Sequence, residues 1–323
     1  MAARLKIEKI TVMHEKTRLA VPVWTLDSGK PGPRFLVLAA QHGNEVQGSE
    51  AIRRFIAWAR TRIVAGRIAA IPFANLPAIR GRRPHFGMGP EQAYADDRGH
   101  NMNRTWSGGF NNSTARLAAA IYDAYGADAT HVLDIHCWEQ SAAPGVITRD
   151  EPRLRALAEN LGARFVNLAQ PSPHTIGGRF NSGGRVGITY ECSGQYMVCE
   201  EQVQACLAVI VNMAKAIGVA RGEPQPVQPV IFLSEAETTR VLAPQPGLFV
   251  RGKFRHGDKV RKGAVLGHIL SDDDLSWNAV AAPVSGYLRQ CGAARAGADV
   301  ALPGRHPYVA EGERLATICR QAD

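Results

Sequence analysis

The stretch AAQHGNEVQGSEAI, residues 39–52, follows an apolar run, RFLVLAA (34–40), and leads into an amphipathic one, SEAIRRFIAWAR (49–60). The first run has the length and composition of a buried strand, and the second has apolar side chains at helical spacing. Between them, a glycine-flanked turn carries His42 and Glu45, three residues apart. A strand, a polar turn and a helix in this order indicate an α/β fold, in which ligands bind at such turns.

The same alternation continues over the first two thirds of the chain. Strands are predicted at residues 67–75, 131–136, 164–169 and 187–194, and helices at 114–126 (capped by Ser113 or Thr114), 153–162 and 202–218. We therefore expect a mostly parallel, mixed sheet flanked by helices. Polar residues fall where predicted strands end, namely at His42, Glu45, Asn75, His136 and Glu191. Such residues should meet at one edge of the sheet.

The last third of the chain has a different character. A proline-rich linker, RGEPQPVQPV (221–230), is followed by short apolar runs broken by glycine and proline. This pattern predicts an α/β domain over residues 1–222 and a small all-β, barrel-like domain over 223–323. Two phrases, at 257–269 and 282–286, resemble the biotinyl/lipoyl-carrier type of barrel. The hairpin between them has no lysine, so we expect the shape without the attached cofactor.

Composition excludes several functional classes. The net charge of +9 comes from scattered basic residues, and no nucleic-acid motif accompanies them, so we expect no nucleic-acid partner. No apolar run approaches the roughly 18 residues that a membrane helix needs, and the N-terminus does not have the pattern of a signal peptide. The six cysteines have no CxxC spacing. Reduced thiols in a cytoplasmic protein are the expectation.

The turn and a later strand end together suggest a metal site. Zinc in enzymes is held by histidine nitrogen and carboxylate oxygen, with one position left open. His42 and Glu45 can reach one ion from the same turn, and His136, which ends the strand HVLDIH, is the candidate third ligand. Asp134 lies two residues earlier on the same face of that strand, where it can support His136 or a neighbouring group.

Three further segments carry groups suited to hydrolysis. The loop GHNMNRTW (99–106) offers amides and a guanidinium that can bind a carboxylate. The loop IRGRRP (79–84) offers three arginines, one of which can stabilise negative charge on a carbonyl oxygen. Glu191 lies where the strand GITYECSG passes into a turn, and a carboxylate beside a metal-activated water can accept its proton.

HxxE, N-x-N-R, D-I-H and T-x-E-x-S/G-G, in this order over about residues 34 to 218, resemble the succinylglutamate desuccinylase/aspartoacylase family, a branch of the zinc carboxypeptidase fold. The resemblance implies one zinc ion per chain, Glu191 as general base, a substrate clamp, and an arginine that polarises the carbonyl. It implies the following sets: zinc ligands His42, Glu45 and His136; clamp residues Asn101, Asn103 and Arg104; and a polarising Arg83, with Arg82 and Arg98 behind it.

Two features depart from the family pattern. A long segment, PHFGMGPEQAYADDRGH (84–100), precedes the N-x-N-R loop, and Trp106-Ser107-Gly108 stands where Phe-Pro-Gly is usual. Both bear on which substrate fits.

The function implied is zinc-dependent removal of an acyl group from an N-acyl amino acid or a related small acylated amine. A small acylated amino acid is thus the expected partner, and a homo-oligomer is compatible with the sequence. Two alternatives stay open: a carboxypeptidase, which a long groove would favour, and a non-catalytic zinc-stabilised binding module. A closed structural zinc site offers four protein ligands, whereas three are found here. The β-domain is expected to lie over the site and to narrow it.

Overall fold

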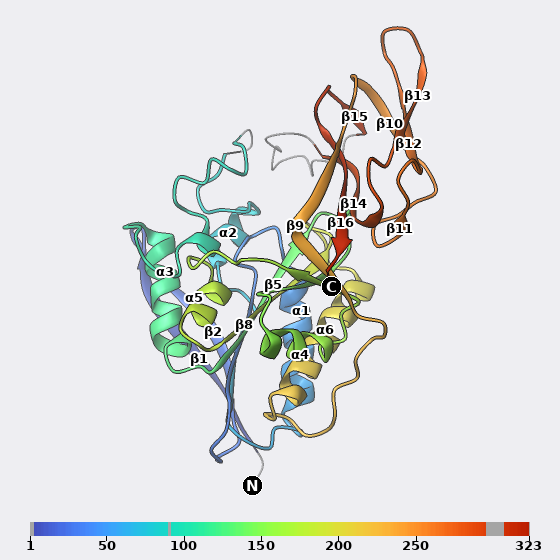
Figure 1. The fold of residues 1–323 in the computed structure, drawn as a ribbon. Coiled ribbons are helices and arrows are strands. Elements are labelled where there is room, and N and C mark those ends of the chain that lie inside the picture. Colours follow the sequence, from blue (N-terminus) through green and yellow to red (C-terminus); the bar gives the residue numbers. More distant parts are fainter. Residues whose placement is uncertain (1–2, 90–91, 295–306, 323) are drawn as a thin grey trace.

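The computed structural model describes residues 3–89, 92–294 and 307–322. One twelve-stranded sheet runs through most of the molecule, and a second, four-stranded sheet packs beside its far end (Figure 1). No helix among the described residues is long and apolar enough to cross a membrane. The expected α/β class with a trailing β part is confirmed.

The large sheet has the order β1-β2-β4-β3-β5-β8-β6-β7-β9-β16-β14-β11. Its first eight strands are β1 (Arg4–His14), β2 (Thr17–Asp27), β4 (Arg67–Ile71), β3 (Arg34–Ala39), β5 (His131–Trp138), β8 (Val186–Ser193), β6 (Gly145–Thr148) and β7 (Phe165–Leu168). Strands β4, β3, β5 and β8 are parallel neighbours. Strand β2 runs antiparallel to β1 and β4, and β6 runs antiparallel to β8 but parallel to β7. The sheet is therefore mixed with a parallel centre.

Helices cover both faces of this sheet. They are α1 (Gln47–Ala59), α2 (Leu76–Gly81), α3 (Ser113–Ile121), α4 (Pro152–Glu159), α5 (Ile176–Ser182) and α6 (Glu200–Ala216), with a 3₁₀ turn η1 (Met102–Arg104) and a π turn η2 (Tyr122–Gly126). Helices α1, α4 and α6 share one core with the sheet, and α3 and α5 share another (Figure 1). Strand β3 serves both, because Phe35 and Val37 enter one core while Leu36 and Leu38 enter the other.

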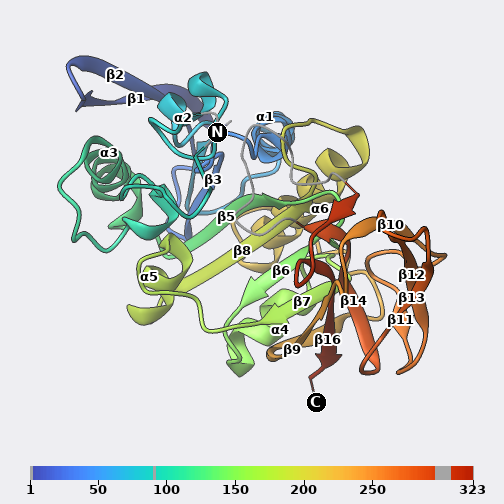
Figure 2. The same ribbon diagram turned by 90° about the horizontal axis from the view of Figure 1, so that it is seen from above.

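The C-terminal third continues the large sheet. Its strands are β9 (Ile231–Leu242), β10 (Gly247–Arg251), β11 (Lys259–Val260), β12 (Val265–Leu270), β13 (Trp277–Ala281), β14 (Gly286–Ala294), β15 (Tyr308–Val309) and β16 (Arg314–Gln321). Strand β9 pairs in parallel with β7, and β16, β14 and β11 follow it, so these four extend the sheet (Figure 2). The other four form the second sheet, in the order β13-β12-β10-β15. A shared apolar core fills the space between the two.

The predicted elements of the first two thirds are all present, with shifted ends. The helix expected over 114–126 ends at Ile121 and continues as the π turn. Its cap is Asn112 and not Ser113 or Thr114, because the Asn112 side chain accepts a hydrogen bond from the Ala115 N–H. The hairpin β1–β2, strand β6 and helix α5 were not expected. All six cysteines are free, as predicted.

Candidate metal centre and active site

Three neighbouring parallel strands bring the candidate residues to one edge of the sheet. His42 and Glu45 lie in the turn between β3 and α1, His136 lies near the end of β5, and Glu191 lies near the end of β8. Strand β5 is between the other two, and His136 is directly opposite Glu191 in the register. The position agrees with the rule that ligands bind at the carboxyl ends of parallel strands.

Glu45 lies between the two histidines. Its Oε1 is 3.0 Å from His42 Nδ1, and its Oε2 is 2.8 Å from His136 Nδ1. One ligand atom from each of the three residues falls within 4.8 Å of the others, and all three side chains are buried. Two imidazole nitrogens and a carboxylate around one point are a donor set that suits zinc. The residues present therefore fit the ion that the sequence predicts.

The far nitrogen of His136 is held by a chain of buried side chains. His136 Nε2 is 3.0 Å from Asp134 Oδ2, and the Gln41 side-chain amide donates to Asp134 Oδ1 at 2.6 Å. The Trp106 indole N–H in turn donates to Gln41 Oε1 at 2.6 Å. If Nε2 carries the hydrogen and directs it at Asp134, Nδ1 keeps the lone pair that can bind a metal ion. Trp106, one of the departures from the family pattern, thus helps to orient His136.

The far nitrogen of His42 has different partners. Its Nε2 is 3.1 Å from Asn101 Oδ1 and 3.3 Å from the Tyr94 hydroxyl. Asn101 Oδ1 also accepts a hydrogen bond from the Asn103 N–H at 3.1 Å. The Asn101 side chain, predicted to touch the substrate, therefore lies against a metal-site histidine.

Opposing effects set the ionisation of Glu45. Burial disfavours its charged form, but the positive charge of His42 and a hydrogen bond from His136 outweigh burial and hold the pKa of Glu45 well below its usual range. The Cys137 backbone N–H also donates to Glu45 Oε2 at 3.1 Å. Glu45 is therefore an ionised, fixed carboxylate, as a metal ligand has to be.

Glu191 has the opposite behaviour. Burial raises the pKa of Glu191 to about 8, the charge of His136 acts against this rise, and the charge of Glu45 adds to it. Among the described residues, Glu191 Oε2 has no hydrogen-bond partner. A buried carboxyl with one free oxygen and a raised pKa can hold and release a proton near neutral pH.

The arginines lie further out. Arg104 is exposed, and its guanidinium donates to the Asn103 carbonyl at 2.8 Å, while Asn103 Oδ1 is buried and without a partner in the described part of the chain. Arg83 is half-buried just after α2. Arg82 and Arg98 are exposed, and Arg98 is 3.7 Å from Asp96. In the described part of the chain, none of these guanidinium groups forms a hydrogen bond or ion pair with the metal donors, so their roles stay predictions.

Sequence reasoning missed four side chains at the site: Gln41, His85, Tyr94 and Gln195. The Gln195 amide donates to the Cys137 carbonyl at 2.9 Å and reaches Glu45 Oε1 at 3.4 Å. His85 and Tyr94 come from the long segment at 84–100, whose residues 90–91 lie outside the described residues. The unusual length of that segment was the available signal, but length alone does not single out a residue.

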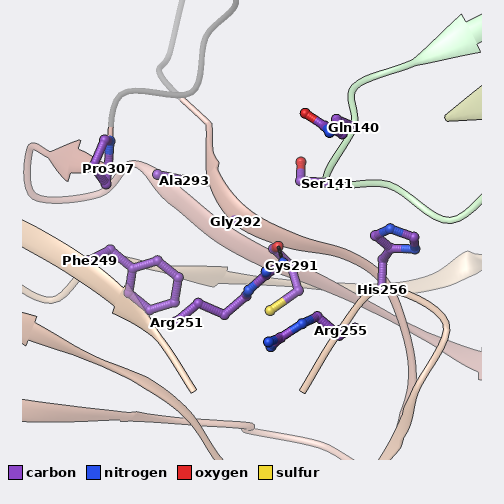
Figure 3. A pocket seen from close by; sticks show the side chains of 10 residues that line it. All are labelled: Gln140, Ser141, Phe249, Arg251, Arg255, His256, Cys291, Gly292, Ala293 and Pro307. Carbon is purple, nitrogen blue, oxygen red and sulfur yellow. Dashed lines mark hydrogen bonds between the residues drawn. The ribbon is translucent and has the colours of Figure 1, made fainter. Parts of the chain in front are cut away.

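The loop after β5 connects the site to the C-terminal part. The Ala143 N–H donates to the Arg289 carbonyl at 2.8 Å, and the Cys291 N–H donates to the Ser141 carbonyl at 3.0 Å. A cavity of about 560 Å³ lies along this seam (Figure 3). Its lining consists of Gln140, Ser141, Phe249, Arg251, Arg255, His256, Cys291, Gly292, Ala293 and Pro307. None of the metal donors belongs to that lining, so the cavity is separate from the metal centre.

Comparison with known proteins identifies the family of this chain. The model of the succinylglutamate desuccinylase/aspartoacylase catalytic domain matches residues 31–217, and the chain belongs to that family. Members of the family are deacylases that hydrolyse non-peptide amide bonds. The predicted family is thereby confirmed.

Individual relatives are distant. The N-alpha-acetyl-L-2,4-diaminobutyric acid deacetylase of Halomonas elongata is 24% identical over 261 residues, which cover 77% of this chain and 73% of the relative. A succinylglutamate desuccinylase/aspartoacylase structure from Rhodobacter sphaeroides has a TM-score of 0.77 at 22% identity, covering 99% of this chain and 96% of the other. The product-bound ectoine utilization protein EutE (DoeB) of Ruegeria pomeroyi has a TM-score of 0.75 at 19% identity, covering 99% and 95%. At these identities the structural matches show a shared fold.

Proposed function

We propose that this protein is a zinc-dependent amide hydrolase that removes a small acyl group from an N-acyl amino acid. The observation that carries the proposal is the placement of Glu191 directly opposite His136, next to the buried cluster of His42, Glu45 and His136. A cluster of three protein donors with a carboxyl group beside it is the arrangement of a catalytic zinc site, in which one position stays open.

The three donors would hold the ion through His42 Nδ1, a Glu45 oxygen and His136 Nδ1. Zinc bound there supplies Lewis acidity, which makes water a better nucleophile and the amide carbonyl a better electrophile. The rest of the chemistry falls to protein side chains.

Glu191 is the proposed acid–base group. It takes a proton from the attacking water as the C–O bond forms, and it delivers that proton to the amine nitrogen as the C–N bond breaks. Because burial raises its pKa to about 8, Glu191 can carry the proton between the two steps at neutral pH. The products are a carboxylic acid and a free amino acid.

The substrate carboxylate is the proposed ligand of Arg104 and Asn103. Arg104 is exposed, and the side-chain amide of Asn103 carries an NH₂ group that can donate to a carboxylate. Arg83, next to the metal-binding turn, is the proposed group for the carbonyl oxygen. An N-acetyl amino acid is the favoured substrate class, because the curated relative in Halomonas elongata is an acetyl-diaminobutyrate deacetylase.

The test is hydrolysis by zinc-loaded protein of a panel of N-acetyl, N-succinyl and N-formyl amino acids, with dipeptides included. We expect turnover of at least one acyl amino acid. Glu191→Gln keeps the side-chain shape but removes the base, and should lower kcat by about 10²- to 10⁴-fold. Zinc content, measured by atomic absorption, should be unchanged in the variant.

Two outcomes would contradict the proposal. Turnover of dipeptides alone would make the protein a peptidase. Stoichiometric zinc without turnover of any panel member would favour a binding module.

A further inference from the structure

The long segment at 84–100 places two aromatic rings against the metal centre. The ring centroid of His85 is 5.3 Å from that of His42, and the ring of Tyr94 is 5.8 Å from the same imidazole. The two rings also contact each other, with centroids 4.6 Å apart. His85 is fully buried, whereas Tyr94 remains half-buried. Of the pair, Tyr94 is therefore the one that a ligand can reach.

The hydroxyl of Tyr94 has a defined position beside His42. It lies 3.3 Å from His42 Nε2, the nitrogen that Asn101 also contacts. When Nδ1 of His42 is used as a metal donor, Nε2 carries the hydrogen and is a donor. That single hydrogen is directed at two acceptors, Asn101 Oδ1 and the Tyr94 oxygen, so the Tyr94 O–H is available for another acceptor.

The groups around this hydroxyl belong to the site. Tyr94 lies within electrostatic reach of Glu45, Arg104 and Glu191. Its O–H lies beside His42, where Asn101, the first residue of the loop that carries Asn103 and Arg104, makes its own contact with the same nitrogen. Among the described residues, the hydroxyl has His42 as its one side-chain hydrogen-bond partner.

We infer that Tyr94 is a substrate-contacting residue whose hydroxyl donates a hydrogen bond to the substrate carboxylate at Arg104. This inference rests on the proposed function for the identity of the ligand. Tyr94 then supplies a donor that distinguishes a free carboxylate from an uncharged group. A carboxamide in the same position presents a neutral oxygen and gains less from a hydrogen bond than a carboxylate does.

The alternative role for Tyr94 is positioning of His42. In that case the hydroxyl acts only on the metal ligand, and its removal lowers metal affinity, as loss of an outer partner does by about 10- to 100-fold. The two roles are distinguished by measuring how removal of the hydroxyl changes the affinity for zinc and the affinity for the ligand.

The experiment compares Glu191→Gln with the double variant Tyr94→Phe/Glu191→Gln, both loaded with zinc. The Glu191→Gln substitution slows turnover, so binding of N-acetyl-L-2,4-diaminobutyrate and of its carboxamide can be measured by calorimetry. Zinc affinity is measured separately by competition with a chromophoric chelator. Tyr125→Phe is the matched control, because the Tyr125 hydroxyl donates to Glu8 at 2.8 Å, away from the metal centre. Asn101→Ala is the control for loss of an outer partner.

We expect Tyr94→Phe to lower the affinity for the free acid by about 10- to 100-fold, as for loss of a hydrogen bond to a charged group. The affinity for the carboxamide should fall much less, and the affinity for zinc should stay within about twofold of the value for Glu191→Gln. Tyr125→Phe should change none of these values, and Asn101→Ala should lower zinc affinity.

Three results would overturn the inference: equal weakening of acid and carboxamide, a drop in zinc affinity of tenfold or more for Tyr94→Phe, or no binding of the free acid to Glu191→Gln. Failure of the proposed function would look different. The free acid would bind to Glu191→Gln in a Tyr94-dependent way, while the wild-type protein would hydrolyse no panel member.

Discussion

At the scale of single residues, the two histidines of the site have the same partner at Nδ1 and different partners at Nε2. Both direct Nδ1 at Glu45. On the far side, His136 Nε2 meets the carboxylate of Asp134, while His42 Nε2 meets the neutral amide of Asn101. A charged partner makes an imidazole a stronger donor than a neutral one does. His136 is therefore the more firmly oriented of the two.

Asp134→Asn tests this difference. Burial lowers the pKa of His136, but the charge and hydrogen bond of Asp134 outweigh burial and raise it well above its usual value. In the metal-free protein at neutral pH His136 then holds an extra proton, which zinc has to displace. The variant lacks that raised pKa, so zinc binding should release fewer protons at pH 7. Zinc affinity should also fall by about 10- to 100-fold.

Proton release can be measured from the dependence of the calorimetric enthalpy on the ionisation enthalpy of the buffer. Asp128→Asn is the control, because Asp128 is exposed and pairs with Arg34. Equal proton release by wild type and Asp134→Asn would show that Asp134 does not set the protonation of His136.

At the scale of elements, local patterns predicted the units that carry the donors. The run at 34–40, the polar turn and the amphipathic helix after it are present as β3, a turn and α1. The hairpin β1–β2 was missed although it has a signal, because Leu19, Val21 and Val23 alternate with more exposed residues. Helix α5 has little signal, since its sequence IGGRFNS contains two glycines.

The candidate site was predictable only in part. The three metal donors and Glu191 lie at or just after the carboxyl ends of strands, so their meeting is a consequence of a parallel sheet. Tyr94 and Gln41 reach the histidines through packing of irregular segments. Their contacts depend on tertiary structure, which no periodicity records.

The metal-binding turn depends on a close backbone approach at Gly43. A Cβ at this position would lie 2.2 Å from the Ala78 carbonyl carbon and 2.4 Å from the Arg83 carbonyl oxygen. Both neighbours are backbone atoms that cannot rotate away. Gly43→Ala should thus push the turn off α2, lower stability by about 1–3 kcal/mol as overpacking does, and weaken zinc binding through displaced His42.

Gly81→Ala is the matched control, because a Cβ at Gly81 meets no atom within 4 Å. Thermal unfolding and chelator competition provide the two measurements. If Gly43→Ala has the unfolding temperature and the zinc affinity of the wild type, the turn tolerates a shift away from α2.

At the scale of the whole molecule, the C-terminal part is built into the catalytic sheet. Strand β9 pairs with β7 of the catalytic part. A small core also crosses the join, with Ala143 and Phe165 on one side and Ile231, Leu233, Tyr287 and Cys319 on the other. The proline-rich linker therefore leads into a fixed placement. The same placement brings β14 against the loop that follows His136.

Arg289 of β14 extends the influence of this part to the acid–base group. Its guanidinium lies 5.1 Å from the ring centre of Trp138, at the end of β5. Burial raises the pKa of Glu191, and the positive charge of Arg289 is among the groups that act against this rise. Glu191 has to be ionised to accept a proton from water, so activity falls as the pH drops below its pKa.

Arg289→Met keeps most of the side-chain volume and removes the charge. The pKa of Glu191 should then rise, and the acidic limb of the kcat/KM profile should move to higher pH with zinc content unchanged. Lys262→Met, which removes a positive charge from an exposed turn of the same part, should leave the acidic limb in place. An equal shift in both variants would indicate a general effect of net charge, and an unmoved limb in Arg289→Met would show that the C-terminal part does not tune the acid–base group.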